Sequence, residues 1–543
     1  MTRSDGKLDA MRHAQAPCVV VAVILAVAAA CDAAPRVLHH RRDPGALVVA
    51  QAADITGLDL VRVVDAESIE VGEILFEGLA RWVPGTTAVE PGLATGWQVS
   101  PDGLRWTFAL RRGVVFHDGQ ALDAAAVVFS FERVIDPQHA SYVRGDDGLY
   151  WRALLKDVRR VRALGARSVE IEVARPYAPL LGELAMFPIV SPAAVRRWGD
   201  AFNEHPVGTG AFELEAWERD EQVVVKRFAG YWGAAPALER IVFRVVVDAR
   251  QRLVDLQSGA VDLAAGILPD EQSFVELHPD LVLHHKPTNA ISYLAFNTQH
   301  PPFDDRRVRR ALSHAINKEP IVKLAYQGRA VAADSALPPG QWGYRLPATR
   351  YAYDPPVARG LLAALAAEHA FDPARVYKLY APTTPRAYLS QPERVARYLQ
   401  TALAQVGVKT ELVMQNIADH VASVSRGDHD LALIGWIGDT GDPDNFLYVL
   451  LHSDNAVPGP AQNVAFYKSP QVDALLIRAQ AGSNEASRGA LYGEIQELVA
   501  ADAPWVPIAN SELVIAARSD LEHVILTPLG HPLYALIRRK DAR

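Results

Sequence analysis

Residues 375–437 alternate strand and helix patterns, and this alternation constrains the fold more than any other feature of the chain. The runs RVYKLYAP, VKTELVMQ and DLALIGW are typical of strands, and QPERVARYLQTALAQVG and IADHVASVSRG are typical of helices between them. The longer helix has Pro392 near its start and Gly407 at its end. Strands joined by helical crossovers run parallel in one sheet. The sequence therefore predicts an α/β fold.

Two oppositely charged residues follow two of these strands. Arg386 lies in the loop after the first strand and Asp439 in the loop after the third. Because parallel strands share a direction, both loops should emerge at the edge of the sheet where ligands of open α/β folds bind. Asp439 can accept hydrogen bonds from an ammonium group, and Arg386 can hold a carboxylate with two parallel hydrogen bonds. The pair therefore suits a zwitterion such as a free peptide.

The segment GWIGDTGDPDNF (435–446) places three aspartates close together, which suggests a metal site, a shared proton or a cationic ligand group. A calcium loop needs alternating oxygen donors and a distal glutamate, and here a proline interrupts the run and the glutamate is missing. Asp442 and Asp444 are typical turn residues that bond the local backbone. We therefore expect these two to shape the turn and Asp439 to meet the ligand. Trp436 fits either a core position or a pocket wall.

The length and composition indicate a globular protein of several parts. At 543 residues the chain exceeds the roughly 250 to 300 residues at which single cores stop growing. Half of its residues are apolar and 22% are charged, which is enough apolar material for large cores. The net charge of -8 and the lack of a long basic run argue against a nucleic-acid partner.

The run ALVVAQAADITGLD should begin the body with a strand, followed by an amphipathic helix over 67–81.

The N-terminus has the layout of a secretory signal. A short basic segment precedes the apolar run CVVVAVILAVAAA (18–30), which is shorter than the roughly 20 residues of a membrane-spanning helix. The only two cysteines are Cys18 and Cys31, so the body holds no cysteine-based disulfide or metal site. VAAAC resembles a bacterial lipobox, which would make Cys31 an acylated first residue. The alternative is plain cleavage after AAA, which would give a soluble secreted protein, and Met11 is an alternative start. Residues 31–44 should be a tether.

Several longer blocks resemble one family, in the family's order and over most of the mature chain. They are LRRGVVFHDGQALDAAAVVFSFERVIDP (110–137), PVGTGAFELEAWERDEQVVVKRFAGYWG (206–233), YLAFNTQHPPFDDRRVRRALSHAINKEPIV (293–322) and the segment around Asp439. These blocks are similar to those of the bacterial extracellular solute-binding proteins of family 5, the peptide and nickel group, and most of all to its dipeptide-binding subfamily.

The resemblance implies a two-lobed periplasmic binding protein fold, type II, of the large peptide-binding class. By the family pattern the first lobe is discontinuous and carries an inserted subdomain at 81–205, while 289–505 form the second lobe. The pieces of the first lobe are 45–80, 206–288 and 506–543. The lobes would close on a solute and deliver it to the permease subunits of an ABC importer in the inner membrane. Such a protein would be periplasmic or attached to the cell envelope, most simply as a monomer.

The resemblance also assigns residues. The aspartate of the family's W-x-x-D segment meets the α-amino group of a bound peptide, and here WIGD gives Asp439 and the neighbouring Trp436. Dipeptide-binding members carry an arginine for the peptide carboxylate in the upstream loop, where APTTPRAYLSQPERVARYLQ aligns Arg386, with Tyr388 close by. A dipeptide of about 7 Å with two contacts of about 2.8 Å would place the two charged groups about 10 to 13 Å apart. Arg386 could instead be a surface residue or pair with Glu393.

Other readings remain open. The same fold binds haem, oligopeptides, antimicrobial peptides or nickel complexes in other members of the family. A secreted hydrolase is the rival from another class, but the sequence has no phosphate-binding loop, no G-x-S-x-G elbow and no H-E-x-x-H motif. FHDG (116–119) is the most catalytic-looking pair and lies in a predicted hairpin, where the family uses it structurally. We therefore expect no enzyme activity, no cofactor and no metal.

Overall fold

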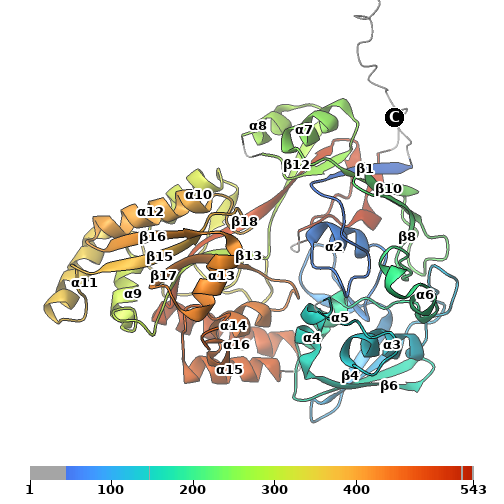
Figure 1. The fold of residues 1–543 in the computed structure, drawn as a ribbon, viewed down its shortest axis with the longest axis horizontal. Coiled ribbons are helices and arrows are strands. Elements are labelled where there is room, and N and C mark those ends of the chain that lie inside the picture. Colours follow the sequence, from blue (N-terminus) through green and yellow to red (C-terminus); the bar gives the residue numbers. More distant parts are fainter. Residues whose placement is uncertain (1–44, 146, 269, 483, 528–529, 541–543) are drawn as a thin grey trace, which may run out of the picture. The chain divides into compact units, whose positions relative to one another are not determined.

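A computed structural model describes residues 45–540 apart from positions 146, 269, 483, 528 and 529 (Figure 1). The predicted signal sequence at 1–30, the tether at 31–44 and the lipidation site Cys31 lie outside the described residues. None of the helices between residues 45 and 540, the five gaps aside, is long and apolar enough to cross a membrane.

In the described part of the chain, twelve strands form one mixed sheet, with the order β16-β15-β17-β13-β18-β11-β1-β10-β9-β8 and with β12 and β14 paired to β18. The strands are β1 (Ala46–Gln51), β8 (Phe212–Glu218), β9 (Gln222–Arg227), β10 (Arg240–Val245), β11 (Leu263–Ala265), β12 (Leu281–Pro287), β13 (Ala290–Phe296), β14 (Ala330–Ala332), β15 (Val376–Pro382), β16 (Lys409–Gln415), β17 (Leu431–Ile437) and β18 (Trp505–Arg518).

The predicted strand and helix alternation is confirmed. Helix α12 (Pro392–Gln405) connects β15 to β16, and α13 (Ile417–Arg426) connects β16 to β17. β15 pairs in parallel with both other strands, with Leu379 opposite Leu431 and Leu412. One apolar face of α12 is buried through Val395, Leu399, Ala402 and Leu403, and Val406 directly after the helix is buried as well. Gly407 then takes a positive φ of 88°, a conformation that glycine adopts without steric cost and that ends the helix.

Helices cover both faces of this part of the sheet, because successive strand residues point to opposite sides. Leu294 and Leu433 pack with one set of helices, whereas Tyr293 and Ala432 pack with the other. The first set is α9 (Arg306–Ser313), α10 (Lys318–Ala325), α11 (Pro355–Ala367) and α12. The second set is α13, α14 (Asp444–Leu451), α15 (Pro470–Gln480) and α16 (Glu485–Asp502). We call the layer around β13 and β15–β17 the second lobe.

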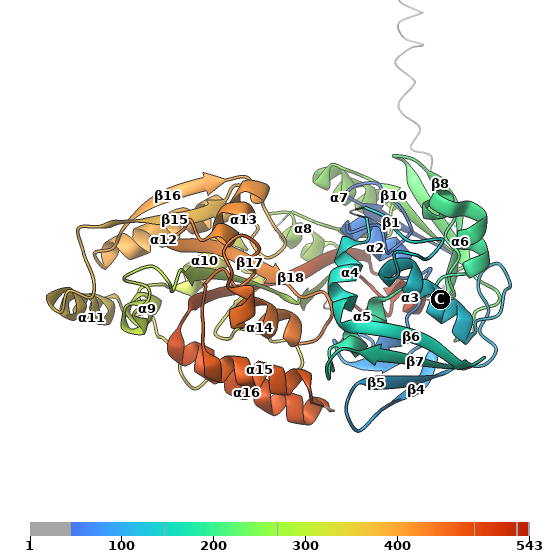
Figure 2. The same cartoon turned by 60° about the horizontal axis from the view of Figure 1, so that its bottom comes forward.

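A second, four-stranded antiparallel sheet has the order β4-β5-β7-β6 (Figure 2). Its strands are β4 (Ala94–Val99), β5 (Arg105–Leu110), β6 (Val158–Gly165) and β7 (Ser168–Val173). The predicted hairpin-then-helix block becomes β5, an isolated bridge between Val115 and Ala121, and then α3 (Ala124–Ile135), which packs on β6. With α4 (Leu149–Leu154) and α5 (Leu180–Met186) this sheet forms what we call the inserted subdomain.

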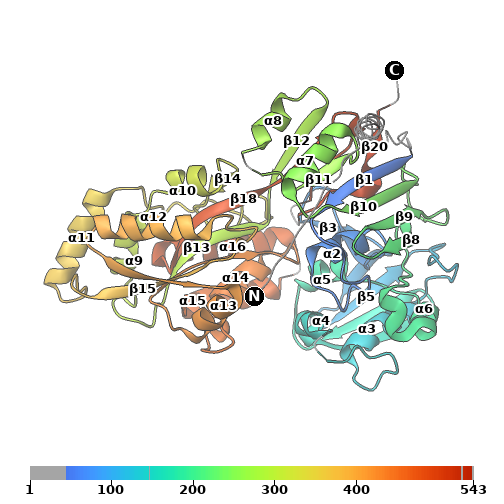
Figure 3. The same cartoon turned by 45° about the horizontal axis from the view of Figure 1, so that its top comes forward.

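The long strand β18 belongs to two parts of the large sheet (Figure 3). Its first residues pair with β13, with Trp505 opposite Ala295, whereas its last residues pair with β12 and β11. We call the layer built on β1 and β8–β12 the first lobe. The boundary expected between residues 505 and 506 falls inside this shared strand, and the residue limits of the lobes stay a prediction.

The helix expected over 67–81 is wrong in its second half. Helix α2 covers only Ala66–Gly72, and strand β2 (Ala80–Trp82) follows. Instead of continuing the helix, Glu77 is bonded by Thr209, Tyr231 and Trp232, so long-range contacts override the local apolar period.

The remaining elements are β3 (Val89–Pro91), α6 (Pro192–Trp198), α7 (Ala249–Ser258), α8 (Gln272–Leu277), β19 (Leu521–Glu522), β20 (Arg538–Arg539) and the short 3-10 helices Leu155–Asp157, Gly199–Asn203, Ser453–Asn455 and Tyr534–Leu536.

Candidate functional site

The loop after β17 is fixed at its first residue. The Gly438 amide donates to the Asn289 carbonyl at 2.7 Å, and the Asn289 side chain donates back to the Gly438 carbonyl at 3.1 Å. A Cβ on Gly438 would lie 2.2 Å from the Phe446 ring, so only glycine fits there. These contacts set the direction in which the next residue, Asp439, leaves the strand.

Asp439 carries a partly exposed carboxylate surrounded by protein atoms. Burial raises the pKa of Asp439 to about 6, and a hydrogen bond from Tyr150 of α4 lowers it by a smaller amount. The Tyr150 hydroxyl donates to Oδ2 at 3.3 Å. No lysine, arginine or histidine of the described residues forms an ion pair with Asp439. The carboxylate is therefore ionised at neutral pH and open to a cationic group.

Asn445 holds two parts of this site. Its Oδ1 accepts the backbone N–H of Asp439 at 3.2 Å and the indole N–H of Trp436 at 3.1 Å. Asn445 lies in the first turn of α14, and Trp436 is half-buried near the end of β17. One side-chain oxygen thus fixes both the acidic loop and the tryptophan ring.

The other two aspartates of the segment are buried and bonded within the protein. Asp442 accepts a hydrogen bond from the backbone N–H of Asp444 at 3.0 Å, as expected of a turn residue. It also accepts hydrogen bonds from both terminal nitrogens of Arg488 at 2.7 Å. Asp444 accepts from the Gln480 amide at 2.8 Å. Both aspartates are structural, through partners about 40 residues away in the sequence.

Arg386 and Tyr388 lie in the loop after β15. Arg386 is exposed, and its backbone exchanges two hydrogen bonds with Leu389 at 3.0 and 2.8 Å. Glu393, the alternative partner considered for Arg386, pairs instead with Arg397 at 2.7 Å. Burial raises the pKa of Tyr388, and the Arg386 guanidinium beside its hydroxyl lowers it by a smaller amount. The guanidinium is therefore next to the Tyr388 side chain.

The two predicted site loops meet at β17. A Cβ on Gly435 would lie 2.3 Å from the Tyr388 ring, so this ring packs directly on the strand beside Trp436. The Tyr388 carbonyl accepts from the Tyr326 hydroxyl at 2.6 Å, which holds the loop against α10. The parallel register of β15 and β17 places both loops at the same edge of the sheet. The distance between Asp439 and Arg386 stays a prediction.

The acidic loop also touches the inserted subdomain and the segment that precedes it. A Cβ on Gly182 of α5 would lie 2.4 Å from the Thr440 carbonyl oxygen, and one on Gly441 would lie 2.7 Å from the Trp82 ring. Gly441 has a positive φ of 64°, so a larger residue would be strained there as well as crowded. The candidate site therefore lies where the second lobe meets the inserted subdomain.

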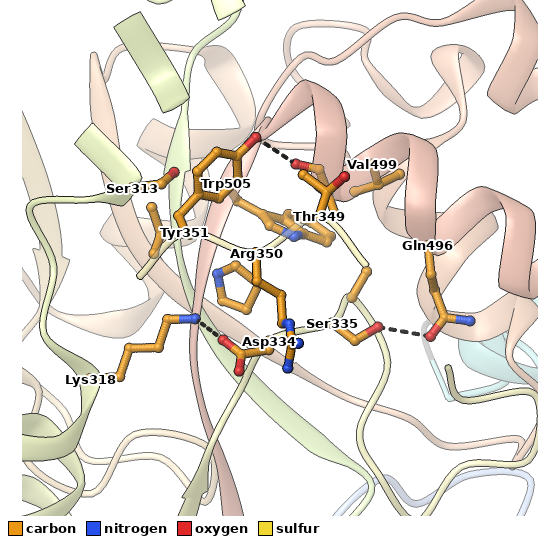
Figure 4. A pocket seen from close by; sticks show the side chains of 14 residues that line it. Ser313, Lys318, Asp334, Ser335, Thr349, Arg350, Tyr351, Gln496, Val499 and Trp505 are labelled. Carbon is orange, nitrogen blue, oxygen red and sulfur yellow. Dashed lines mark hydrogen bonds and ion pairs between the residues drawn. The ribbon is translucent and has the colours of Figure 1, made fainter. Parts of the chain in front are cut away.

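A small cavity of about 40 Å³ lies elsewhere in the second lobe (Figure 4). Its lining includes Lys318, whose ammonium pairs with Asp334 at 2.6 Å, and Ser335, which donates to Gln496 at 2.8 Å. None of Asp439, Arg386, Trp436 and Tyr388 lines it. Its volume suits one or two water molecules rather than a peptide.

Both side chains of the FHDG pair are bonded within the protein, with His117 half-buried and Asp118 exposed. His117 accepts the Gly208 amide at its Nδ1 (3.3 Å) and donates from Nε2 to the Gly210 carbonyl (3.2 Å), and burial lowers its pKa to about 4. Asp118 accepts from the Ser191 hydroxyl at 2.6 Å. Over residues 45–540, outside the gaps, no group of three or more histidine, cysteine or acidic side chains is placed to hold a metal ion.

Comparison with known families gives a match over residues 88–457 to the family described as bacterial extracellular solute-binding proteins, family 5. The matched segment is more than half of the chain and includes the candidate site. The chain belongs to this family.

Relatives and solved structures agree with this family. The chain is 32% identical to the dipeptide-binding protein of Escherichia coli K12 over 86% of this chain and 88% of the relative. It is also 32% identical to heme-binding protein A of Haemophilus influenzae, over 85% and 86% of the two chains. The solved structure of DppA, a periplasmic binding protein of Helicobacter pylori, in complex with the peptide STSA superimposes with a TM-score of 0.74 at 30% identity, covering 92% of this chain and 98% of that one. The two-lobed periplasmic binding protein fold expected from the sequence is confirmed.

Proposed function

We propose that this family 5 member is the substrate-binding component of an ABC importer and that it captures short peptides, dipeptides above all, between its lobes. Asp439 binds the α-amino group of the peptide and Arg386 its carboxylate. Trp436 and Tyr388 form the wall between them. The observation that carries the proposal is the half-buried Asp439: its backbone N–H is held by Asn445, and its carboxylate has no cationic partner among the described side chains.

The chemistry of a free dipeptide fits this arrangement. Charge-assisted hydrogen bonds in a site shielded from water are stronger than those between neutral groups. A peptide ammonium at Asp439 would replace the weak Tyr150 contact with a full ion pair. At the other end, the exposed Arg386 guanidinium is free of the Glu393 carboxylate, which pairs with Arg397. We keep about 10 to 13 Å as the expected separation of the two charged groups.

The rest of the proposal follows the family and the N-terminal sequence. The protein is exported, is attached to the cell envelope through a lipid on Cys31, and acts as a monomer that delivers its ligand to permease subunits. It binds ligand without converting it, and it requires no cofactor. The relatives named above support a peptide ligand, and one of them is a heme-binding protein, so the experiment must separate these two ligand classes.

Titration calorimetry with alanyl-alanine tests the proposed site. Asp439→Asn should weaken binding by about 2 kcal/mol, roughly thirtyfold, because it removes the charge that meets the ligand ammonium. N-acetylation of the dipeptide should weaken binding to the wild type by a similar factor, yet have little further effect on Asp439→Asn. In the same way, Arg386→Gln should weaken binding of the free dipeptide. Amidation of the dipeptide carboxyl group should weaken binding to the wild type but have little further effect on Arg386→Gln. Glu411→Gln, at an exposed position on β16, is the matched control and should bind as the wild type does.

Equal affinity of the wild type and Asp439→Asn for the dipeptide would overturn the assignment of Asp439. Native mass spectrometry of the purified protein then identifies any ligand that remains bound. A haem or a long peptide in that spectrum, together with no calorimetric signal for dipeptides, would contradict the dipeptide proposal itself.

A further inference from the structure

Four carboxyl groups and two guanidinium groups are linked where the inserted subdomain meets the second lobe. We call Asp157, Arg175, Glu183, Asp442, Asp444 and Arg488 the interlobe carboxyl cluster. The link between the two sides runs through Gln480 of α15: its carbonyl accepts the Ala178 amide at 2.7 Å, its side-chain oxygen accepts from Arg175, and its amide donates to Asp444 at 2.8 Å. Gly182 lies against Thr440 at the same contact.

The charges in this cluster do not balance. Arg488 pairs with Asp442 through two bonds of 2.7 Å, and Arg175 pairs with Asp157 at 3.0 Å. Each guanidinium thus forms an ion pair with one carboxylate. Asp444 and Glu183 are left without an ion pair among the described residues, although they are only 4% and 1% exposed.

One oxygen of each of these two carboxyl groups also has no hydrogen-bond partner. Glu183 accepts from the Tyr177 hydroxyl at Oε1 (2.7 Å), and its Oε2 is buried and unpartnered within the described structure. Asp444 accepts from Gln480 at Oδ2, and its Oδ1 is buried and unpartnered in the same sense. Burying an ionised carboxylate under such conditions is costly, so the neutral, protonated form is favoured.

The surroundings explain how strongly a proton is held. Burial raises the pKa of Glu183 to about 8, the charges of Asp444, Asp157 and Asp442 add to this, and the bond from Tyr177 opposes it. Burial also raises the pKa of Asp444 to about 7, with the Asp442 charge adding and with Gln480, Arg488 and Arg175 opposing. Four tyrosine hydroxyls also face the two carboxyls from the inserted subdomain, α14 and α16, and burial together with the carboxyl charges raises the pKa of each: Tyr150, Tyr177, Tyr448 and Tyr492.

We propose that Glu183 and Asp444 form a proton-binding site that is completed only when the inserted subdomain contacts the second lobe, so that protons are taken up as the lobes close. The inference rests on the proposed function for the closing motion itself. In the separated state both carboxyls face water and have ordinary acidity. Closure is then unhindered below pH 4, becomes less favourable as the pH rises toward 7 and 8, and levels off above that range.

Distance measurement between the lobes tests the site without any ligand. Because the body has no cysteine, spin labels can be attached selectively, once Cys31 is replaced by serine, at Leu164→Cys of the inserted subdomain and Leu361→Cys of α11, which are 50% and 42% exposed. Pulsed electron resonance should show the short interlobe distance losing population between pH 5 and pH 8. Glu183→Gln and Asp444→Asn, which keep shape but stay neutral, should each reduce this dependence, and the double variant should abolish it.

Calorimetry counts the protons. Alanyl-alanine binding at pH 7.5 in phosphate and in Tris, which differ in ionisation enthalpy, should show greater proton uptake for the wild type than for Glu183→Gln, by roughly one proton at most. At pH 8 the variant should bind more tightly than the wild type by at least about tenfold, with the ratio falling toward one as the pH is lowered to 4. Glu411→Gln should match the wild type in both experiments.

Two results would overturn the proposal: a wild-type distance distribution that does not change with pH, or a pH dependence that survives in the double variant. Failure of the proposed function is distinguishable, because it would remove the calorimetric signal for the dipeptide while leaving the ligand-free distance measurement intact.

Discussion

Asn445 is the residue on which the geometry of the candidate site depends. Its single amide oxygen holds the Asp439 backbone and the Trp436 indole, at 3.2 and 3.1 Å. Asn445→Ala removes this acceptor and should weaken binding of a free dipeptide by about tenfold, because both groups lose their fixed orientation. Calorimetry with the free and the N-acetylated dipeptide checks it, since only the free form uses Asp439.

The control for this prediction is Asn445→Asp, which keeps an acceptor oxygen in place. It should keep Trp436 and the loop ordered, while its added negative charge raises the pKa of Asp439. An equal loss of affinity for both dipeptide forms in Asn445→Ala would indicate a general disturbance of the fold and would contradict a positioning role.

At this scale the sequence identified which residues carry charge but not how they are held. Asp439, Arg386 and Tyr388 stand out because they follow predicted strands and match family segments. Nothing in the sequence indicated that Arg488 and Gln480 bind these aspartates, because they lie more than 35 residues after them. Only the packing of α15 and α16 brings the two side chains next to Asp442 and Asp444. The turn role assigned to Asp442 is confirmed by its bond from the Asp444 amide.

Strand β17 is the element that brings the two site loops together, and Gly435 is its critical position. Gly435→Ala would place a methyl group 2.3 Å from the Tyr388 ring and 2.4 Å from the Ile291 carbonyl. It should lower the free energy of unfolding by about 1 to 3 kcal/mol, as overpacking does in buried cores. Urea denaturation followed by circular dichroism measures this loss.

Gly360 in α11 is the matched control, because an added Cβ there meets nothing within 4 Å. Gly360→Ala should raise stability by about 0.5 to 1 kcal/mol, as expected for an exposed helix interior. Similar effects of the two substitutions would show that the close approach of Tyr388 to Gly435 has no energetic consequence.

Elements were predicted well where local pattern and packing agree. The β15–α12–β16–α13–β17 unit was predicted correctly because strand-type and helix-type patterns alternate along it, with Pro392 and Gly407 at the two ends of the longer helix. The helix expected over 67–81 stopped at Gly72, and Glu77 beyond it is bonded by Thr209, Tyr231 and Trp232. Periodicity within one segment contains no information about partners more than 130 residues later in the chain.

For the whole molecule, peptide binding should depend on pH through two sets of groups that act in opposite directions. Below about pH 6 Asp439 becomes protonated, because burial raises its pKa to that value, and binding must then expel this proton, which weakens affinity by up to about tenfold per unit. From about pH 4 to 8 the interlobe carboxyl cluster makes closure less favourable as the pH rises, and toward pH 8 the peptide amine also loses its proton. Calorimetry from pH 4.5 to 9 with one dipeptide should therefore show affinity falling above pH 6 and changing less steeply below it, where the two effects oppose each other.

The variants separate the two effects. Asp439→Asn should remove the opposing contribution below pH 6, so that the fall in affinity with rising pH extends down to pH 4.5. The double variant Glu183→Gln, Asp444→Asn should leave the loss of affinity below pH 6 and the fall near pH 8 that the peptide amine alone produces. A wild-type affinity that stays constant from pH 4.5 to 9 would contradict the assignments of both groups.

Strand β18 has a further consequence, for the order of events during synthesis. It lies between β13 and β11 in the large sheet, so without it the sheet falls into two incomplete halves. Its last residue, Arg518, is 25 positions from the end of this 543-residue chain. β18 also follows every other strand of this sheet in the sequence. During synthesis the sheet therefore cannot be completed until its last strand has been made, although the remaining strands of both lobes are already present.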